Sequence, residues 1–270
     1  MAVVIAHYRE NLDWISLIPS TIKEIIVYHK GGYQLSKLRS KFLLPNDNRI
    51  RIYSLPNIGR EGHTFLYHII NNFNQWNNNT NITDNDRITF LQGNPLEHSP
   101  YLFSKLFQNY SQWETVQPLG YQFTESIPPR NIRNYFDDGC MVLWMDGNLN
   151  HYLPEKWTDP GIQYLQKKYR KMYPDRSILE NFLKQCYLSY LFVEYMEINK
   201  NNNKYQHLFP FTYGGLVSVT INQILKQPLD VYNNLVRGLF ISRDSQGGLE
   251  GYLLERIWLL LWRYVSKEKI

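Results

Sequence analysis

The chain has 270 residues and a net charge of +5, with 43% hydrophobic and 20% charged residues. This composition excludes a disordered chain and suits one large α/β domain. The positive charge favours an anionic ligand. Because it is not gathered into a basic stripe, it does not indicate a nucleic-acid partner, and we expect none.

The cysteines and the apolar segments predict a cytoplasmic protein. Cys140 and Cys186 lie far apart and lack metal-ligand spacing, which excludes a disulfide framework. Residues 1–9 lack the basic start and long apolar run of a signal peptide. Residues 253–265 are the most apolar late segment, but they include charged side chains and are too short to span a bilayer. We therefore expect no transmembrane segment.

The first half of the chain alternates between strand and helix patterns. The order strand, helix, strand, strand, helix, strand predicts an α/β fold with an open, mostly parallel sheet. The strands are predicted at residues 3–6, 22–28, 49–55 and 87–91, and the helices at residues 12–18 and after residue 59.

The second half is less regular, and we find neither an internal repeat nor a linker. We therefore predict a single domain over residues 1–270, with residues 1–98 as one half and 99–270 as the other. Ser218 is expected to cap a helix that runs to Leu225. The remaining predictions are helices at residues 99–113, 177–197, 230–239 and 249–265, an extended or loop segment at 117–133 and a strand at 141–145.

The stretch at residues 56–70 is the most informative part of the sequence. A turn leads into an amphipathic helix, and polar residues crowd the start of that helix: Asn57, Gly59, Arg60, Glu61 and His63. Free backbone N–H groups at a helix N-terminus attract anions, and an arginine adds donors suited to phosphate. The alternative is a capped helix with a surface Arg–Glu pair.

Polar residues also follow the other predicted strands. They lie at residues 7–11, 28–30, 57–63 and 92–98. In an open parallel sheet, ligands bind beyond the carboxyl ends of the strands. We therefore expect these four segments to meet at one edge, where His7, His29, His63 and His98 would also be candidates for a metal cluster.

Glu255 is the best candidate for a general base. It shares a helical stripe with Trp258 and Trp262, and a carboxylate beside tryptophans can have a raised pKa. The alternative is a helix glutamate paired with an arginine.

Several segments together resemble a known family. They are residues 3–14, 26–30, 57–61, 90–93 and Glu255-Arg256-Ile257-Trp258, in that order. They resemble a family of uncharacterised proteins from fungi, microbes and large DNA viruses. That family is similar to nucleotide-sugar glycosyltransferases of the GT-A type. The resemblance covers most of the chain and is most specific over residues 3–98.

The resemblance implies a single GT-A-like, Rossmann-like domain with a mixed, mostly parallel central sheet flanked by helices. Its nucleotide-binding half would hold a nucleotide-sugar donor, and its second half a glycan or protein acceptor. The activity would be hexosyl or pentosyl transfer, in the host cytoplasm if the protein is viral. The alternative is a catalytically inactive sugar- or nucleotide-binding protein of the same fold.

The resemblance also assigns residues to roles. Glu255 would be the base, with Glu250 in reserve, and Gly214, Gly215 and Trp258 would face the acceptor. The donor would be bound by His7, Tyr8, Arg9, Glu10, Tyr28, Lys30, Asn57, Gly59, Arg60, Glu61, His63, Gln92, Gly93 and Asn94.

One departure from the GT-A pattern concerns the metal. Many GT-A enzymes carry an Asp-X-Asp motif after the fourth strand, where this chain has Gln92-Gly93-Asn94. Either manganese or magnesium is not used, or it is held elsewhere. Arg9, Lys30 and Arg60 could neutralise the leaving diphosphate instead.

Overall fold

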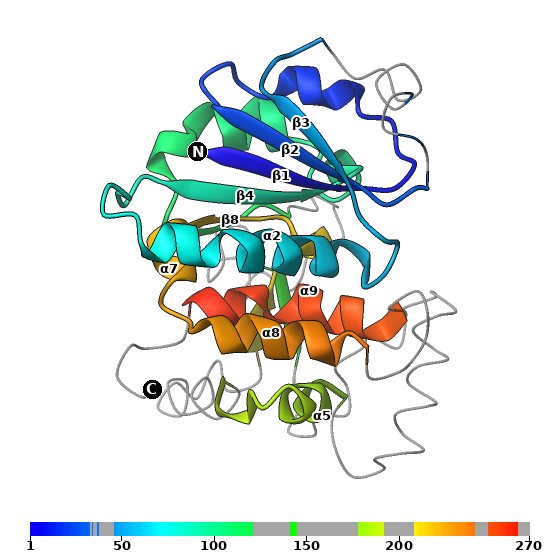
Figure 1. Ribbon diagram of the computed structural model, residues 1–270, viewed down its shortest axis with the longest axis vertical. Coiled ribbons are helices and arrows are strands. Elements are labelled where there is room, and N and C mark those ends of the chain that lie inside the picture. The colour runs from blue at the N-terminus through cyan, green and yellow to red at the C-terminus, as the bar shows by residue number, and fades with distance from the viewer. Residues whose placement is uncertain are drawn as a thin grey trace.

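A six-stranded mixed sheet forms the centre of the molecule (Figure 1). The computed structural model describes residues 1–32, 34, 37, 46–120, 141–144, 178–191, 208–240 and 248–263. The strand order is β3-β2-β1-β4-β8-β5. The strands are β1 (Ala2–His7), β2 (Glu24–His29), β3 (Ile50–Ser54), β4 (Arg87–Gln92), β5 (Val116–Pro118) and β8 (Val217–Thr220).

Strands β1 to β4 run parallel, whereas β8 is antiparallel to both β4 and β5. The predicted α/β class, with a mixed, mostly parallel sheet flanked by helices, is therefore confirmed. β8 and β5 come from the second half of the sequence, so both halves contribute to one sheet.

Helices cover both faces of the sheet (Figure 1). On one face lie α2 (Arg60–Asn77), α8 (Leu229–Gly238) and α9 (Gly248–Arg263), with α5 (Ile178–Gln185) beyond them. The other face carries η1 (Asp13–Leu17), a π-helical turn η3 (Leu102–Leu106) and η4 (Phe107–Gln112). The short elements are η2 (Pro95–Glu97), η6 (Tyr213–Gly215), α7 (Ile221–Ile224) and a separate ladder of β6 (Met141–Trp144) and β7 (Leu208–Phe211).

Two apolar clusters explain the layers. Alternate residues of a strand point to opposite faces, so β1 sends Val4 toward α2, and Val3 and Ile5 toward η1 and η3. All three side chains are fully buried. Burial on both faces is why the first strands appear in the sequence as continuous apolar runs.

Two predicted elements of the second half differ from the structure. The helix expected to begin at Ser218 is wrong, because Ser218 lies within β8 and Thr220 caps α7 instead. The helix expected over residues 177–197 ends at Gln185, and Tyr187 then has a left-handed φ of 58°. The predicted residues at 121–133, 145, 177, 192–197 and 264–265 lie outside the described part of the chain, as does Cys140.

No helix within the described ranges is long and apolar enough to cross a membrane.

Candidate functional site

The carboxyl ends of the four parallel strands meet at one edge, which we call the carboxyl edge. In the sheet, β1 lies between β2 and β4. The chain continues from β1 to β2 on one side, and β4 is added later on the other side. Such a reversal of strand order is the usual place for a ligand in an open α/β sheet. The strand ends and the start of α2 at this edge carry most of the residues predicted from the sequence.

A histidine pair closes the ends of β1 and β2. His7 and His29 are register partners, both fully buried, with their Nδ1 atoms 3.0 Å apart. Burial lowers the pKa of both, and His7 adds to the effect on His29, whose pKa falls to about 4. Both rings are therefore neutral at pH 7. Because His7 Nε2 lies 3.1 Å from the Glu10 carbonyl, we assign its proton to Nε2, so His29 Nδ1–H donates to His7.

The loop after β1 is held by Glu10. The Glu10 carboxylate accepts the backbone N–H groups of Tyr8 and Arg9 at 2.7 and 3.0 Å. A side chain at Gly93 would collide with this carboxylate, because an added Cβ would lie 2.3 Å from Oε2. Glu10 therefore shapes the edge, while Arg9 remains exposed with its guanidinium 4.8 Å from the Tyr8 ring centre.

Lys30 fixes the start of α2. Its ammonium donates to the backbone carbonyls of Ile58, at 2.5 Å, and of Arg60. The side chain is 5% exposed, and burial lowers its pKa to about 8. A lysine held in this way positions the 56–60 turn. Arg9 and Arg60 are the exposed arginines at this edge within the described residues.

Arg60 begins α2 in an unusual conformation. Its φ is 50°, in the left-handed region that costs a non-glycine residue roughly 1–2 kcal/mol. Strain of this kind is concentrated at functional sites. The Arg60 side chain is 41% exposed and pairs with Glu61, with its Nε 3.6 Å from Oε2.

Two buried carboxylates lie beneath this part of the edge. Glu255 is 7% exposed, and its Oε1 accepts the Gly214 N–H at 2.8 Å. The Glu61 side chain is 11% exposed. Burial raises the pKa of Glu61, Arg60 opposes the rise, and the charge of Glu255 adds to it.

Gly214 joins α9 to the end of β4. Its φ is 63°, and an added Cβ would lie 2.8 Å from His98 Cδ2 and 3.1 Å from Gln92. Only glycine fits this position without strain. Gly214 therefore contacts the candidate base Glu255 through its N–H group and packs closely against Gln92 and His98.

The remaining predicted residues take different positions. Asn57 and Asn94 are exposed at the edge, and Gly59 caps α2 with a left-handed φ of 60°. His63 is 8% exposed and packs against Tyr67 and Phe240.

Three predicted residues lie away from the edge. Tyr28 points to the α2 face, where its hydroxyl lies 3.1 Å from His68 Nδ1. Glu250 is fully buried. Burial raises the pKa of the Cys186 thiol to about 12, and the charge of Glu250 adds to this rise. Trp258 is also fully buried; it stacks on Trp262 and lies beneath Gly215.

A metal does not fit the described residues. No group of three or more His, Cys, Asp or Glu side chains in the described ranges could hold a metal ion. Of the four histidines considered for a cluster, His7 and His29 meet as a pair.

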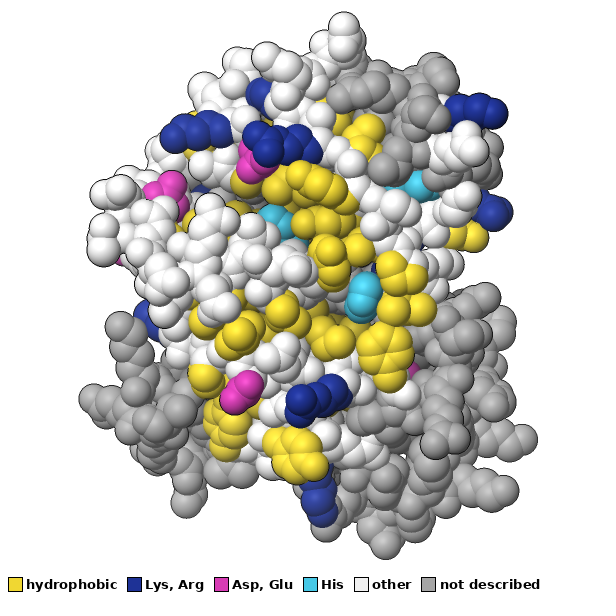
Figure 2. Space-filling model, viewed as in Figure 1, with side chains coloured by type: hydrophobic (Ala, Val, Ile, Leu, Met, Phe, Trp, Pro, Cys, Tyr) yellow, Lys and Arg dark blue, Asp and Glu magenta, His cyan; other side chains and the backbone are white. Residues whose placement is uncertain are grey.

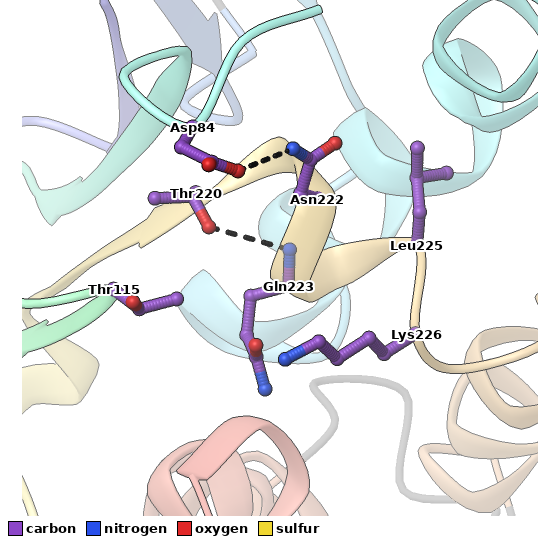
Figure 3. Close-up of a pocket in the computed structure, with 7 residues that line it drawn as sticks. All are labelled: Asp84, Thr115, Thr220, Asn222, Gln223, Leu225 and Lys226. Atoms are coloured by element: carbon purple, nitrogen blue, oxygen red, sulfur yellow. Dashed lines mark hydrogen bonds between the residues drawn. The ribbon is translucent and has the colours of Figure 1, made fainter. Parts of the chain in front are cut away.

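A cavity lies at the opposite end of the parallel strands from the carboxyl edge, and Figure 3 shows the residues that line it. It measures about 560 Å³ and surrounds the start of α7, where Asn222 donates to Asp84 at 2.9 Å. The sequence did not predict this cavity, because the β8 strand that forms one wall was expected to be a helix. The other lining residues are Thr115, Thr220, Gln223, Leu225 and Lys226.

The fold defines an α/β protein whose strand order begins β3-β2-β1-β4, the order with which the sheet of many doubly wound proteins begins. No family model, curated protein or solved structure matches the chain.

Proposed function

We propose that the protein is a glycosyltransferase of GT-A type that holds a nucleotide-sugar donor at the carboxyl edge and transfers its sugar to a glycan or protein acceptor. The observation that carries the proposal is the convergence of four strand ends and the α2 N-terminus on this edge. Arg9 and Arg60 supply positive charge there, and a helix N-terminus attracts phosphate.

The transfer step assigns one role to Glu255. Its carboxylate takes the proton of an acceptor hydroxyl, and that oxygen bonds to the anomeric carbon as the bond to the diphosphate breaks. The diphosphate leaves with the electron pair, and Arg9 and Arg60 compensate its charge. The hydrogen bond from Gly214 N–H orients the Glu255 carboxylate for this step.

Binding without transfer is the second candidate. It is favoured by the burial of Glu255, which is 7% exposed and already accepts one hydrogen bond. Such a protein would hold the same donor at the same edge without a base that reaches the acceptor.

A donor panel tests the binding step. We expect nucleotide sugars to raise the melting temperature, and Arg9→Gln to weaken this response at least about tenfold in apparent affinity. Lys23→Gln is the matched control, since it removes one exposed charge at the other end of β2. If no uridine, guanosine, adenosine or cytidine diphosphate sugar shifts the melting temperature, the proposal is wrong.

Turnover separates the two candidates. Hydrolysis of a bound donor should be lost in Glu255→Gln, which keeps an acceptor oxygen for Gly214 N–H, and retained in Glu250→Gln. Thermal melting of both variants shows that they remain folded. Unchanged hydrolysis in Glu255→Gln would reject the assigned base, and donor binding without hydrolysis in the wild type would establish the second candidate.

A further inference from the structure

A second cavity lies on the α2 face of the sheet, apart from the carboxyl edge. It measures about 380 Å³ and is bounded by β2, β3 and the later turns of α2. Figure 2 views this face and shows hydrophobic side chains gathered between the sheet and α2. We call it the tyrosine cavity. Its lining includes Tyr28, Tyr53, His68, Asn72, Gln75 and Trp76.

The aromatic rings form one continuous wall. The ring centres of Tyr28 and Tyr53 are 5.6 Å apart at an angle of 31°. Rings in such contact leave no gap between them for a flat base to enter. Tyr53 is 45% exposed, so its ring is accessible from solvent. The two rings therefore form one apolar surface, on which a ligand with an apolar face can pack.

His68 lines the tyrosine cavity and carries a buried polar atom without a partner. Its side chain is 3% exposed, Nδ1 faces the Tyr28 hydroxyl at 3.1 Å, and buried Nε2 has no hydrogen-bond partner in the structure. Buried polar atoms are rarely left without a partner, so an unpaired one in a residue that lines the cavity indicates a missing partner. Burial lowers the pKa of His68 to about 4, so the ring is neutral at pH 7.

The rim of the tyrosine cavity is polar but carries no net charge. Asn72 and Gln75 bring amides that both donate and accept hydrogen bonds. Arg51 and Glu24 also line the cavity, and their charges cancel in an ion pair of 3.0 Å. This rim suits a neutral ligand whose groups both donate and accept hydrogen bonds. Hydroxyl groups do both.

We propose that the tyrosine cavity binds a neutral sugar ring of a glycan. The ring's C–H face would lie on the tyrosine wall, and its hydroxyls would bond to the amides of Asn72 and Gln75 and to His68. The volume is near the lower end of the roughly 300–1,000 Å³ typical of small-ligand sites, which suits one or two sugar units. This inference does not depend on the transfer proposed for the carboxyl edge.

The test is a binding titration of the whole chain, by calorimetry or saturation-transfer NMR, with neutral oligosaccharides. The probes are maltotriose, cellotriose, mannotriose and tri-N-acetylchitotriose, with uridine and adenosine as base-only probes. We expect at least one oligosaccharide to bind, and Tyr53→Ala and Gln75→Ala each to weaken it at least about fivefold. The matched control is Tyr187→Ala, at an exposed tyrosine just after α5.

Three outcomes would overturn the inference. No oligosaccharide binds up to about 10 mM, or binding survives both cavity variants, or only the base probes bind and lose affinity in Tyr53→Ala. Arg9→Gln keeps the two proposals apart. It should weaken the response to nucleotide sugars and leave oligosaccharide binding unchanged, since Arg9 does not line the cavity.

Discussion

His7 and His29 face each other through their Nδ1 atoms, 3.0 Å apart, at the ends of neighbouring parallel strands. Only one proton fits between the two nitrogens, and burial lowers the pKa of both rings, so the folded pair is uncharged near pH 7. His63 and His68 are also neutral at pH 7, because burial lowers their pKa values to about 4. The sheet edge and the α2 face therefore depend on uncharged histidines.

This dependence predicts loss of stability in acid. In the unfolded chain these histidines have pKa values near 6.5, so as the pH falls from about 6.5 toward 4 the unfolded state binds protons first. Each such histidine lowers the free energy of unfolding by up to about 1.4 kcal/mol per pH unit in this window. Urea unfolding between pH 7 and 4.5 measures the slope. His68→Phe should reduce it, and an equal slope in that variant would contradict the prediction.

Lys30→Met should destabilise the protein through the start of α2. The change leaves the carbonyls of Ile58 and Arg60 without their charged donor. We expect a loss of about 2–3 kcal/mol in the free energy of unfolding. Denaturant unfolding measures it, with Lys23→Met as an exposed control that should change by less than about 0.5 kcal/mol. Equal values for the two variants would show that the Lys30 contacts contribute little.

Gly214→Ala separates collision from backbone strain. Gly214 and Gly32 both have positive φ, of 63° and 74°, but an added Cβ meets nothing within 4 Å at Gly32. Gly32→Ala should therefore lose only the strain energy of roughly 1–2 kcal/mol. Gly214→Ala should lose more, because its Cβ would collide with His98. Melting curves of both variants give the comparison, and a larger loss at Gly32 would reject it.

Donor binding should not require a divalent metal. The Gln92-Gly93-Asn94 position supplies no carboxylate, and no group of three or more His, Cys, Asp or Glu side chains in the described ranges could hold a metal ion. We expect the shift in melting temperature caused by a nucleotide sugar to be the same in EDTA and in manganese. If the melting temperature shifts only when manganese is present, the prediction is wrong, and a metal rather than the arginines compensates the diphosphate charge.

The predictions succeeded for elements whose pattern of apolar residues can be recognised within one short segment. The apolar run at Val3 to Ala6 and the helical spacing of Phe65, Leu66 and Ile69 needed no distant partner to be recognised. The Ser218 prediction failed because the strand at Ser218 depends on pairing with β4 and β5, which the local sequence does not reveal. In the structure Ser218 lies in β8 and accepts a hydrogen bond from Thr89 Oγ1, 129 positions earlier.

Part of the candidate site followed from the sequence, because polar residues after parallel strands must meet at one edge. The roles within the site did not follow. Lys30 and Glu10 looked like ligand-binding residues, but they bond to backbone atoms of the loops. A charged side chain in a loop sequence does not reveal whether its partner is a ligand or the chain itself.

The sequence by itself determined the α/β class, the four parallel strands and the amphipathic α2, since each depends on the period of apolar residues along a short segment. The tertiary structure decided the contacts between segments. It paired His7 with His29, placed Glu255 under Gly214, and turned Tyr28 away from the carboxyl edge into the tyrosine cavity. These contacts join residues tens of positions apart, and their geometry is fixed only when the sheet and helices pack together.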